Sequence, residues 1–284
     1  MNYKNIFYTD KYLKFIKHAE KKKIHCFKVK SSHKTAFMPY VVSDSKLCSL
    51  RYGGIMTNCS ARGFKLSVEK HFYEHCKKHS IRYFEIRHDP FMDHITIGRK
   101  TKKEPFVYID LGKSLSRLRS SISRPHLEAI KRSESEDLKI LEARNKDYLV
   151  LFFKLYKNIL ETKEVLPHPL SYFDKMFHFL GSNMSFVCVS CKKNIIASSI
   201  LLDSFPNVFL MYGGMNELGY RKFAKYFMVY NLMRIYKKRG FRRLILGTGH
   251  TEHDAIYKFK QGFTDTINYI ETFSGNIDRF RKNF

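Results

Sequence analysis

The sequence predicts an α+β protein built from two copies of one domain, each a mixed sheet flanked by helices. One observation is that Leu50–Gly54 and Leu210–Gly214, which share the pattern Leu-x-Tyr-Gly-Gly, lie about 160 residues apart. The other is that each half shows the order strand, strand reaching Tyr-Gly-Gly, helix, strand. A repeat of this length indicates a duplicated domain.

The length of the chain agrees with this duplication. With 284 residues, it exceeds the usual size of one compact domain and is long enough for two hydrophobic cores. We therefore predict a first domain over residues 1–111 and a second over residues 112–284, the second including the helices that link the two.

In the first half, periodicity of two predicts strands and spacing of three to four predicts helices. The expected elements are a helix at 11–23, strands at 26–30, 35–43 and 47–52, a helix at 62–79, and strands at 81–87 and 107–111.

The second half follows the same pattern after a connector at 112–136, in which Pro125 suits the first turn of a helix. The expected elements are helices at 146–162 and 169–180, strands at 185–189, 194–202 and 207–212, a helix at 221–239, a strand at 243–246, a helix at 254–260 and a strand at 266–273.

The charge of the chain indicates anionic partners. Its 52 Lys and Arg outnumber 26 Asp and Glu, and the formal charge of +26 would attract RNA, nucleotide phosphates or the anionic inner face of a membrane. The polar opening residues do not resemble a signal peptide, and no window has the roughly 20 apolar residues of a membrane span. We expect a cytoplasmic protein whose six cysteines are reduced.

Two patterns could in principle bind a metal. His71, His75 and His79 share one helix face beside Cys76, but no further ligand stands at a suitable spacing. The Cys188-Val-Ser-Cys191 segment is strand-like, so that its two thiols would point to opposite faces. We assign both patterns to structure and predict no metal.

The second half carries a family resemblance. It shows Tyr-Gly-Gly, a helix with Lys222 and Ala224, then Lys-Arg-Gly-Phe, a strand ending at Gly247, and the run Tyr257–Phe263. In order and spacing these features resemble the tandem-domain FemAB/FemX-like transferases of the GNAT superfamily, over nearly the whole chain. The resemblance implies two GNAT-like domains.

The same resemblance implies a reaction. An amine of a cell-envelope saccharide or peptide precursor, linked to a nucleotide or lipid, would attack a carbonyl supplied by acyl-CoA or aminoacyl-tRNA. The family position implies that Lys260 stabilises the developing oxyanion and that Phe259 shapes the adjacent wall. The alternative for Lys260 is a surface position on a short terminal helix.

The segment Gly213–Arg221 departs from the Gln/Arg-x-x-Gly-x-Gly/Ala loop with which many GNAT members bind the pyrophosphate of acetyl-CoA. This departure disfavours acetyl-CoA as the donor. The chain also lacks the sustained heptads of a coiled-coil arm, so a role of such an arm in binding tRNA does not carry over.

Further candidates lie at the ends of the second-half strands. Tyr212, Gly213 and Gly214 are expected to line the cleft, and Gly247 stands at the carboxyl end of a strand, where ligands bind in α/β sheets. His250 follows, and it could take a proton from the attacking amine or belong to the cap of the helix that begins near residue 254.

Three arginines complete the candidate substrate site. Arg87, Arg124 and Arg221 could bind phosphates of the acceptor through their guanidinium groups, or they could be ordinary surface residues.

A nonenzymatic RNA-binding protein is the alternative function. The net charge, together with 18 Tyr and 25 Phe that could stack on bases, favours it. The core-like spacing of these aromatic residues and the lack of a compact basic and aromatic motif disfavour it.

Overall fold

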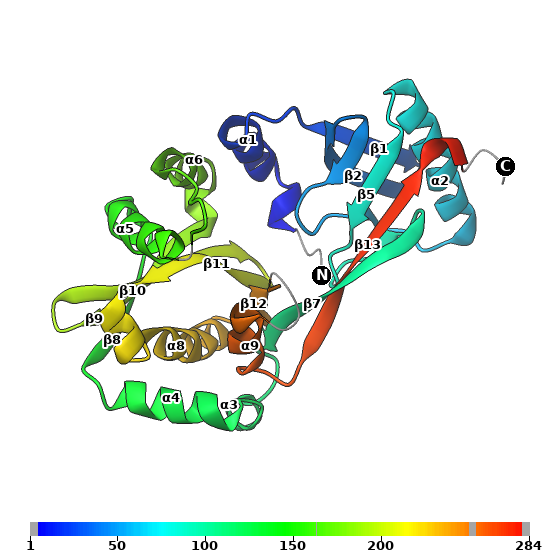
Figure 1. The fold of residues 1–284 in the computed structure, drawn as a ribbon. Helices are drawn as coiled ribbons and strands as arrows, with labels where there is room; N and C mark the ends of the chain where they lie inside the picture. Colours follow the sequence, from blue (N-terminus) through cyan, green and yellow to red (C-terminus); the bar gives the residue numbers. More distant parts are fainter. Residues whose placement is uncertain (1–4, 163, 250–253, 280–284) are drawn as a thin grey trace. The chain divides into compact units, whose positions relative to one another are not determined.

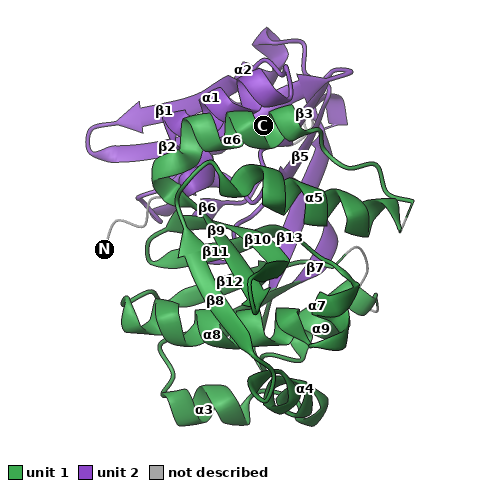
Figure 2. Ribbon diagram, turned by 90° about the vertical axis from the view of Figure 1, so that its left-hand side faces the viewer, with its two compact units in different colours: residues 1–4, 106–268 green, residues 5–105, 269–284 purple. Residues whose placement is uncertain are grey.

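The computed structural model describes residues 5–162, 164–249 and 254–279, which form two compact units. Unit 1 takes residues 106–268, and unit 2 takes residues 5–105 and 269–279 (Figure 2). In the described part of the chain, no helix combines the length and the apolar character needed to cross a bilayer.

The sheet of unit 1 has the strand order β7-β12-β11-β10-β9-β8. Its strands are β7 (Arg99–Asp110, from Phe106 onward), β8 (Leu138–Ala143), β9 (Met184–Cys191), β10 (Asn194–Ser204), β11 (Asn207–Met215) and β12 (Arg243–Gly247). All neighbours pair antiparallel except β11 and β12, which run parallel. Strand β9 is buried along almost its full length, as expected for a central strand with helices on both faces.

Helices cover both faces of this sheet (Figure 1). One face carries α5 (Tyr148–Glu161) and α6 (Leu170–Leu180), which is followed by a 3₁₀ turn at Gly181–Asn183. The other face carries α3 (Leu115–Ser120), α4 (Arg124–Glu134), α7 (Glu217–Arg221), α8 (Ala224–Lys238) and α9 (Ala255–Gln261).

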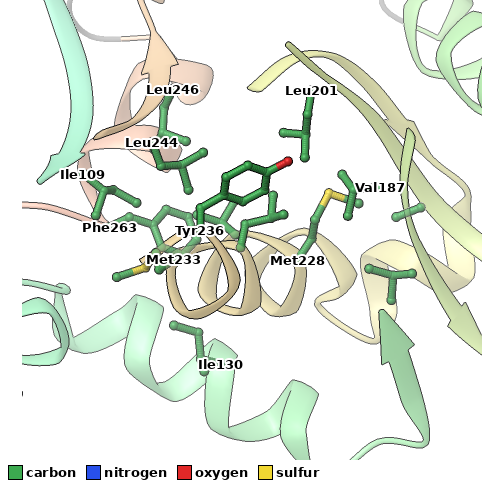
Figure 3. Close-up of a cluster of buried hydrophobic side chains, with 14 of the residues drawn as sticks. Ile109, Ile130, Val187, Leu201, Met228, Met233, Tyr236, Leu244, Leu246 and Phe263 are labelled. Atoms are coloured by element: carbon green, nitrogen blue, oxygen red, sulfur yellow. The ribbon is translucent and has the colours of Figure 1, made fainter. Parts of the chain in front are cut away.

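The core of unit 1 lies between α8 and the sheet (Figure 3). Met228, Leu232 and Tyr236 of α8 recur at intervals of four and are fully buried. They pack with Val187 of β9 and Leu244 of β12 among other apolar side chains. The periodic apolar stripe of the helix therefore explains why it docks on this face.

Unit 2 is built around the strand order β6-β4-β2-β3-β5-β13, in which β3 and β5 run parallel and β1 pairs with β2. Its strands are β1 (His25–Ser31), β2 (Lys34–Ser43), β3 (Lys46–Ser49), β4 (Ile55–Thr57), β5 (Tyr83–Arg87), β6 (His94–Ile95) and β13 (Ile267–Asn276). Its helices are a 3₁₀ turn at Ile6–Tyr8, α1 (Asp10–Ala19) and α2 (Arg62–Lys78).

The two units share one topology. Strands β1, β2 and β3 pair in antiparallel succession, and β3 runs parallel to β5 after the intervening helix α2. Strands β9, β10 and β11 do the same, and β11 runs parallel to β12 after α7 and α8. In the parallel ladders, Lys46 of β3 pairs with Tyr83 of β5, and Asn207 of β11 pairs with Arg243 of β12. The corresponding residues of the two ladders are therefore separated by almost the same number of residues as the two Tyr-Gly-Gly segments.

In each unit, the last strand comes from the other half of the sequence. Strand β7 of the first half pairs with β12 in unit 1, and β13 of the second half pairs with β5 in unit 2. The two units therefore have other bounds than the expected domains 1–111 and 112–284. Residues 106–111 belong to unit 1, and residues 269–279 belong to unit 2 together with the N-terminal strands.

Some local elements differ from the sequence-based expectation. The helix expected over 221–239 begins only at Ala224 and is preceded by the short helix α7, because Phe223 adopts a left-handed conformation with φ of 54° between α7 and α8. Strand β8 lies between the expected connector at 112–136 and the helix expected at 146–162, where no element is predicted. The first Tyr-Gly-Gly follows β3 as a bend, whereas the second lies within β11.

Candidate active site

The sheet of unit 1 opens beside β11, because β11 pairs with β12 over only the first part of its length. The parallel ladder with β12 covers only Asn207–Phe209, although β11 continues to Met215. The antiparallel ladder with β10 shifts register between Ser199 and Leu201. Such a bulge re-aims the side chains that follow it. The second half of β11 therefore borders an opening in unit 1.

A cavity of about 400 Å³ occupies this opening. Leu210, Met211, Gly213 and Met215 of β11 form one wall. The remaining walls come from the end of α5, from α7 and α8, from Leu246 of β12 and from α9. Most of the lining side chains are apolar, and no Asp or Glu is among those described. The volume and lining suit a small organic ligand or the reactive end of a larger one.

Lys260 reaches the cavity from α9. Its ammonium donates a hydrogen bond to the carbonyl oxygen of Thr248 at 2.6 Å. Burial lowers the pKa of Lys260 to about 8, and the nearby Asp254 carboxylate opposes this shift. Lys260 is therefore a partly desolvated cation near neutral pH, and such a donor can stabilise negative charge strongly.

Helix α9 is fixed at both ends. The Asp254 side chain caps it by accepting a hydrogen bond from the Tyr257 backbone N–H at 2.5 Å. Near its other end, His126 Nε2 of α4 donates to the Phe259 carbonyl oxygen at 2.8 Å. Gly262 leaves space for this imidazole, because a Cβ there would lie 2.1 Å from its Cε1. These contacts hold Lys260 in place.

Phe259 forms part of the cavity wall beside Lys260. Its ring makes edge contacts with Tyr226 and Phe263, with centroid distances of 5.1 and 5.2 Å. A packed aromatic cluster of this kind restricts the position of the ring. The structure thus brings together Phe259 and Lys260, the pair that the family resemblance implies.

A second lysine enters the same cavity from α8. Lys225 Nζ donates to the Ser199 hydroxyl at 2.6 Å and to the Ser198 carbonyl oxygen at 3.1 Å. Burial lowers its pKa to about 7, and the Cys188 thiol opposes this shift. Sequence reasoning missed Lys225. The available signal was its position on the buried stripe of α8, three and four residues before Met228 and Val229.

The Tyr-Gly-Gly segment of β11 divides between the two faces of the sheet. Gly213 faces the cavity, where a Cβ would lie 2.5 Å from Lys225 Nζ. Gly214 faces α5, where a Cβ would lie 2.1 Å from the Leu155 carbonyl oxygen. Tyr212 shares that second face, and its hydroxyl lies 3.1 Å from the Tyr172 hydroxyl. Of the three, only Gly213 lines this cavity.

The remaining predicted residues lie in several places. Gly247 ends β12 with φ of 80°, a conformation that favours glycine. Arg221 and Arg124 belong to α7 and α4, where their side chains are 69% and 91% exposed. Arg87 belongs to unit 2, where it pairs with Glu104 at 3.0 Å. His250 lies outside the described residues.

The residues considered as metal ligands have other contacts. His75 Nε2 lies 2.7 Å from the Tyr40 hydroxyl. Cys188 and Cys191 are buried, and Cys188 Sγ lies 3.4 Å from the Ser198 hydroxyl. Within the described ranges, no three His, Cys, Asp or Glu side chains gather as a ligand set.

Comparison with known proteins defines the fold. The structure of FemX has a TM-score of 0.71 with 12% identity over 98% of this chain and 94% of FemX. L-PGS from Bacillus licheniformis gives 0.55 with 11% identity over 94% and 92%. A tandem GNAT protein from the clavulanic acid biosynthesis pathway gives 0.54 with 8% identity over 90% and 83%.

The chain therefore has the tandem GNAT fold. Its likeness to FemX confirms, at the level of fold, the resemblance that the sequence shows. The predicted α+β class with two GNAT-like domains is confirmed as well. No protein-family model and no curated protein matches the sequence.

Gly213→Ala is expected to change the cavity more than the stability of unit 1. The new methyl group would meet the ends of two side chains, Ser199 Oγ at 2.2 Å and Lys225 Nζ at 2.5 Å, and both can rotate away. We expect the free energy of unfolding to fall by about 1 kcal/mol. In the acyl transfer that the family resemblance implies, the displaced lysine should lower activity at least about tenfold. Chemical denaturation and turnover assays on one preparation would check both values.

Lys225→Met is expected to stabilise unit 1 at low pH. Because the pKa of Lys225 falls from 10.5 to about 7 on folding, the unfolded chain binds an extra proton between these values. The wild type therefore gains stability as pH rises through this window and loses it as pH falls towards 7. The side chain stays partly accessible through the cavity, so we expect about 2–3 kcal/mol for the full effect.

Denaturation of both proteins at pH 6 and pH 10 measures this effect. Lys225→Met should be the more stable protein at pH 6, and the difference should shrink at pH 10. Lys238→Met, an exposed position at the end of the same helix, should follow the wild type at both pH values. Equal pH dependence in wild type and Lys225→Met would show that Lys225 keeps an ordinary pKa.

Proposed function

We propose that this protein is a transferase that forms an amide bond, moving an acyl or aminoacyl group to an amine of a cell-envelope saccharide or peptide precursor. The observation that carries the proposal is the cavity beside β11, which places the partly buried Lys260 ammonium and the Phe259 ring on one apolar wall. It lies at an opening between parallel strands, a position where α/β sheets bind ligands.

The chemistry follows from this arrangement. When an amine attacks an ester or thioester carbonyl, negative charge appears on the carbonyl oxygen. A desolvated ammonium that already faces the cavity stabilises that charge without much reorganisation. Holding donor and acceptor together in a largely apolar cavity contributes through proximity and exclusion of water.

The donor is acyl-CoA or aminoacyl-tRNA. The net charge of +26 favours a polyanionic donor such as tRNA. In place of a glycine-rich loop before α8 stands the short helix α7. The backbone N–H of Phe223 donates to the Tyr220 carbonyl oxygen, and that of Tyr226 donates to the Phe223 carbonyl oxygen. These two amides at the start of α8 are thus engaged, which disfavours a pyrophosphate cradle at this helix end.

The acceptor is a nucleotide- or lipid-linked envelope precursor. Exposed arginines such as Arg124 and Arg221 could contact its phosphates, as each has only an exposed i,i+4 ion pair in the described structure. One similar structure, with a TM-score of 0.57 and 12% identity, is named as the C-terminal domain of a lysylphosphatidylglycerol synthetase from Agrobacterium fabrum. Its name contains an anionic lipid, which supports an anionic acceptor here. The protein would work in the cytoplasm, with peripheral contact to the anionic inner face of the membrane.

Transfer assays with purified protein test the proposal. Radiolabelled acetyl-CoA and a mixture of labelled aminoacyl-tRNAs would each be offered with nucleotide-linked saccharide and peptide precursors. Mass spectrometry of molecules that copurify with the protein would guide the choice. We expect label to pass into an acceptor amide with one donor class.

The nonenzymatic RNA-binding function predicts a different result. Tight, salt-sensitive binding of RNA with no transfer from any donor would favour it over the transferase. Binding of tRNA alone does not decide the matter, because an aminoacyl-tRNA donor would bind as well. Turnover is the deciding measurement.

A further inference from the structure

The second lysine of the cavity has an unusual environment for a cation. Lys225 extends from α8 towards β10, and its two hydrogen bonds go to neutral oxygens, those of Ser198 and Ser199. Among the described residues, no carboxylate lines this cavity or influences the pKa of Lys225. Burying a charged ammonium without a counterion is costly, so the surroundings favour the neutral amine.

The groups around Lys225 reinforce this preference. Cys188 of β9, Tyr220 of α7 and Tyr226 of α8 are neutral near pH 7, and the fourth titratable neighbour of the cavity is the cationic Lys260 of α9. Burial raises the pKa of the thiol and of both phenols, which keeps them neutral. No described group in this cavity therefore supplies the negative charge that a protonated Lys225 would need.

The hydrogen bonds leave one position on the nitrogen for a ligand. A neutral amine has two N–H groups and one lone pair. Ser198 and Ser199 accept from the two N–H groups, and Lys225 forms part of the cavity lining beside Gly213. The lone pair can thus face a molecule in the cavity.

We propose that Lys225 is the proton acceptor for the attacking amine in the transfer reaction, an inference that rests on the proposed function. The amine nitrogen forms a bond to the donor carbonyl carbon, and the carbonyl electrons move to the oxygen, which Lys260 stabilises. Lys225 Nζ takes a proton from the attacking nitrogen.

Lys260 and Lys225 also serve the second half of the reaction. The oxyanion collapses, and the bond to the leaving oxygen or sulfur breaks. That atom receives the proton from Lys225, which returns to the neutral amine. The products are one amide and one alcohol or thiol, with every proton accounted for.

Two lysines in one cavity would then have different tasks. The nearby Asp254 carboxylate favours the charged form of Lys260, whereas both hydrogen-bond partners of Lys225 are neutral oxygens. Environments that separate the pKa values of paired groups are typical of acid and base assignments in active sites. Near neutral pH this pair provides one charge donor and one base.

Competitive labelling with acetic anhydride tests the state of Lys225 without any assumption about the substrate. Peptide mass spectrometry would follow the acetylation of each lysine from pH 5 to pH 10. We expect Lys225 to react with a midpoint at least two pH units below that of Lys238, the exposed control on the same helix. A midpoint equal to that of Lys238, or no reaction at all, would overturn the inference.

Kinetics of Lys225→Met test the role itself. Acetyl-CoA and alanyl-tRNA would serve as donors, with ethylamine and hydroxylamine as acceptors, because hydroxylamine is mostly unprotonated at neutral pH and needs a base less. We expect turnover with ethylamine to fall about 100-fold, turnover with hydroxylamine to fall less than tenfold, and Lys238→Met to match the wild type.

The outcomes separate this inference from the proposed function. A wild type that transfers from neither donor, nor from the mixed aminoacyl-tRNAs, to any acceptor including the envelope precursors contradicts the proposed function. An active wild type with undiminished Lys225→Met turnover, or with equal losses for both acceptors, contradicts only the role of Lys225. Thermal denaturation of each variant would confirm that the proteins compared are folded.

Discussion

Replacement of Lys260 by methionine is expected to lower the kcat of acyl transfer by roughly 10²–10³-fold, the usual effect of removing one donor to an oxyanion. Methionine fills a similar volume but cannot stabilise negative charge. The hydrogen bond to the Thr248 carbonyl would be lost, at a cost of about 1 kcal/mol. Removing a buried cation of lowered pKa offsets this cost, so the protein should stay folded.

Lys258→Met is the matched control for this variant. Lys258 lies on the same helix two residues away and is exposed. It should keep wild-type turnover. The loss in Lys260→Met should appear mainly in kcat, because the oxyanion exists only in the transition state and the intermediate. An unchanged kcat in Lys260→Met would remove this residue from the mechanism.

Much of the fold could be predicted because the same local pattern occurs twice. The glycine pairs, the amphipathic helices α2 and α8 and the alternating strands all have clear periodicity. The pairing of β13 with β5 could not be predicted, since partners so far apart in sequence leave no local signal. Contacts of this kind decide which unit the C-terminal strand joins.

The site was predictable to a smaller extent. Lys260 and Phe259 were identified through a family resemblance, and the structure places both at the cavity. Tyr212 and Gly213 are both expected in the cleft because the strand is expected to end at residue 212. Strand β11 continues to Met215, and its period of two sends their side chains to opposite faces. Lys225 required knowledge of what surrounds its nitrogen, because a lysine in an amphipathic helix is usually exposed.

Gly214 of β11 should tolerate alanine poorly. Gly214→Ala would place a Cβ 2.1 Å from the Leu155 carbonyl oxygen and 2.4 Å from the Tyr156 backbone nitrogen of α5. Backbone atoms inside a helix cannot rotate away as side-chain ends do, so α5 and β11 must separate. We expect the free energy of unfolding to fall by about 3 kcal/mol and the Tm by roughly 6–12 °C.

Two other glycines are suitable controls for this prediction. Gly213→Ala has its two shortest contacts with movable side-chain ends and meets one backbone atom, the Ser198 carbonyl oxygen, at 3.1 Å. It should cost about 1 kcal/mol, although it is the adjacent residue of the same strand. Gly63 of α2 has no atom within 4 Å of a new Cβ, and alanine there should stabilise unit 2 by about 0.5 kcal/mol. If Gly214→Ala were as stable as Gly213→Ala, the close packing of α5 on β11 would not be the reason that position 214 requires glycine.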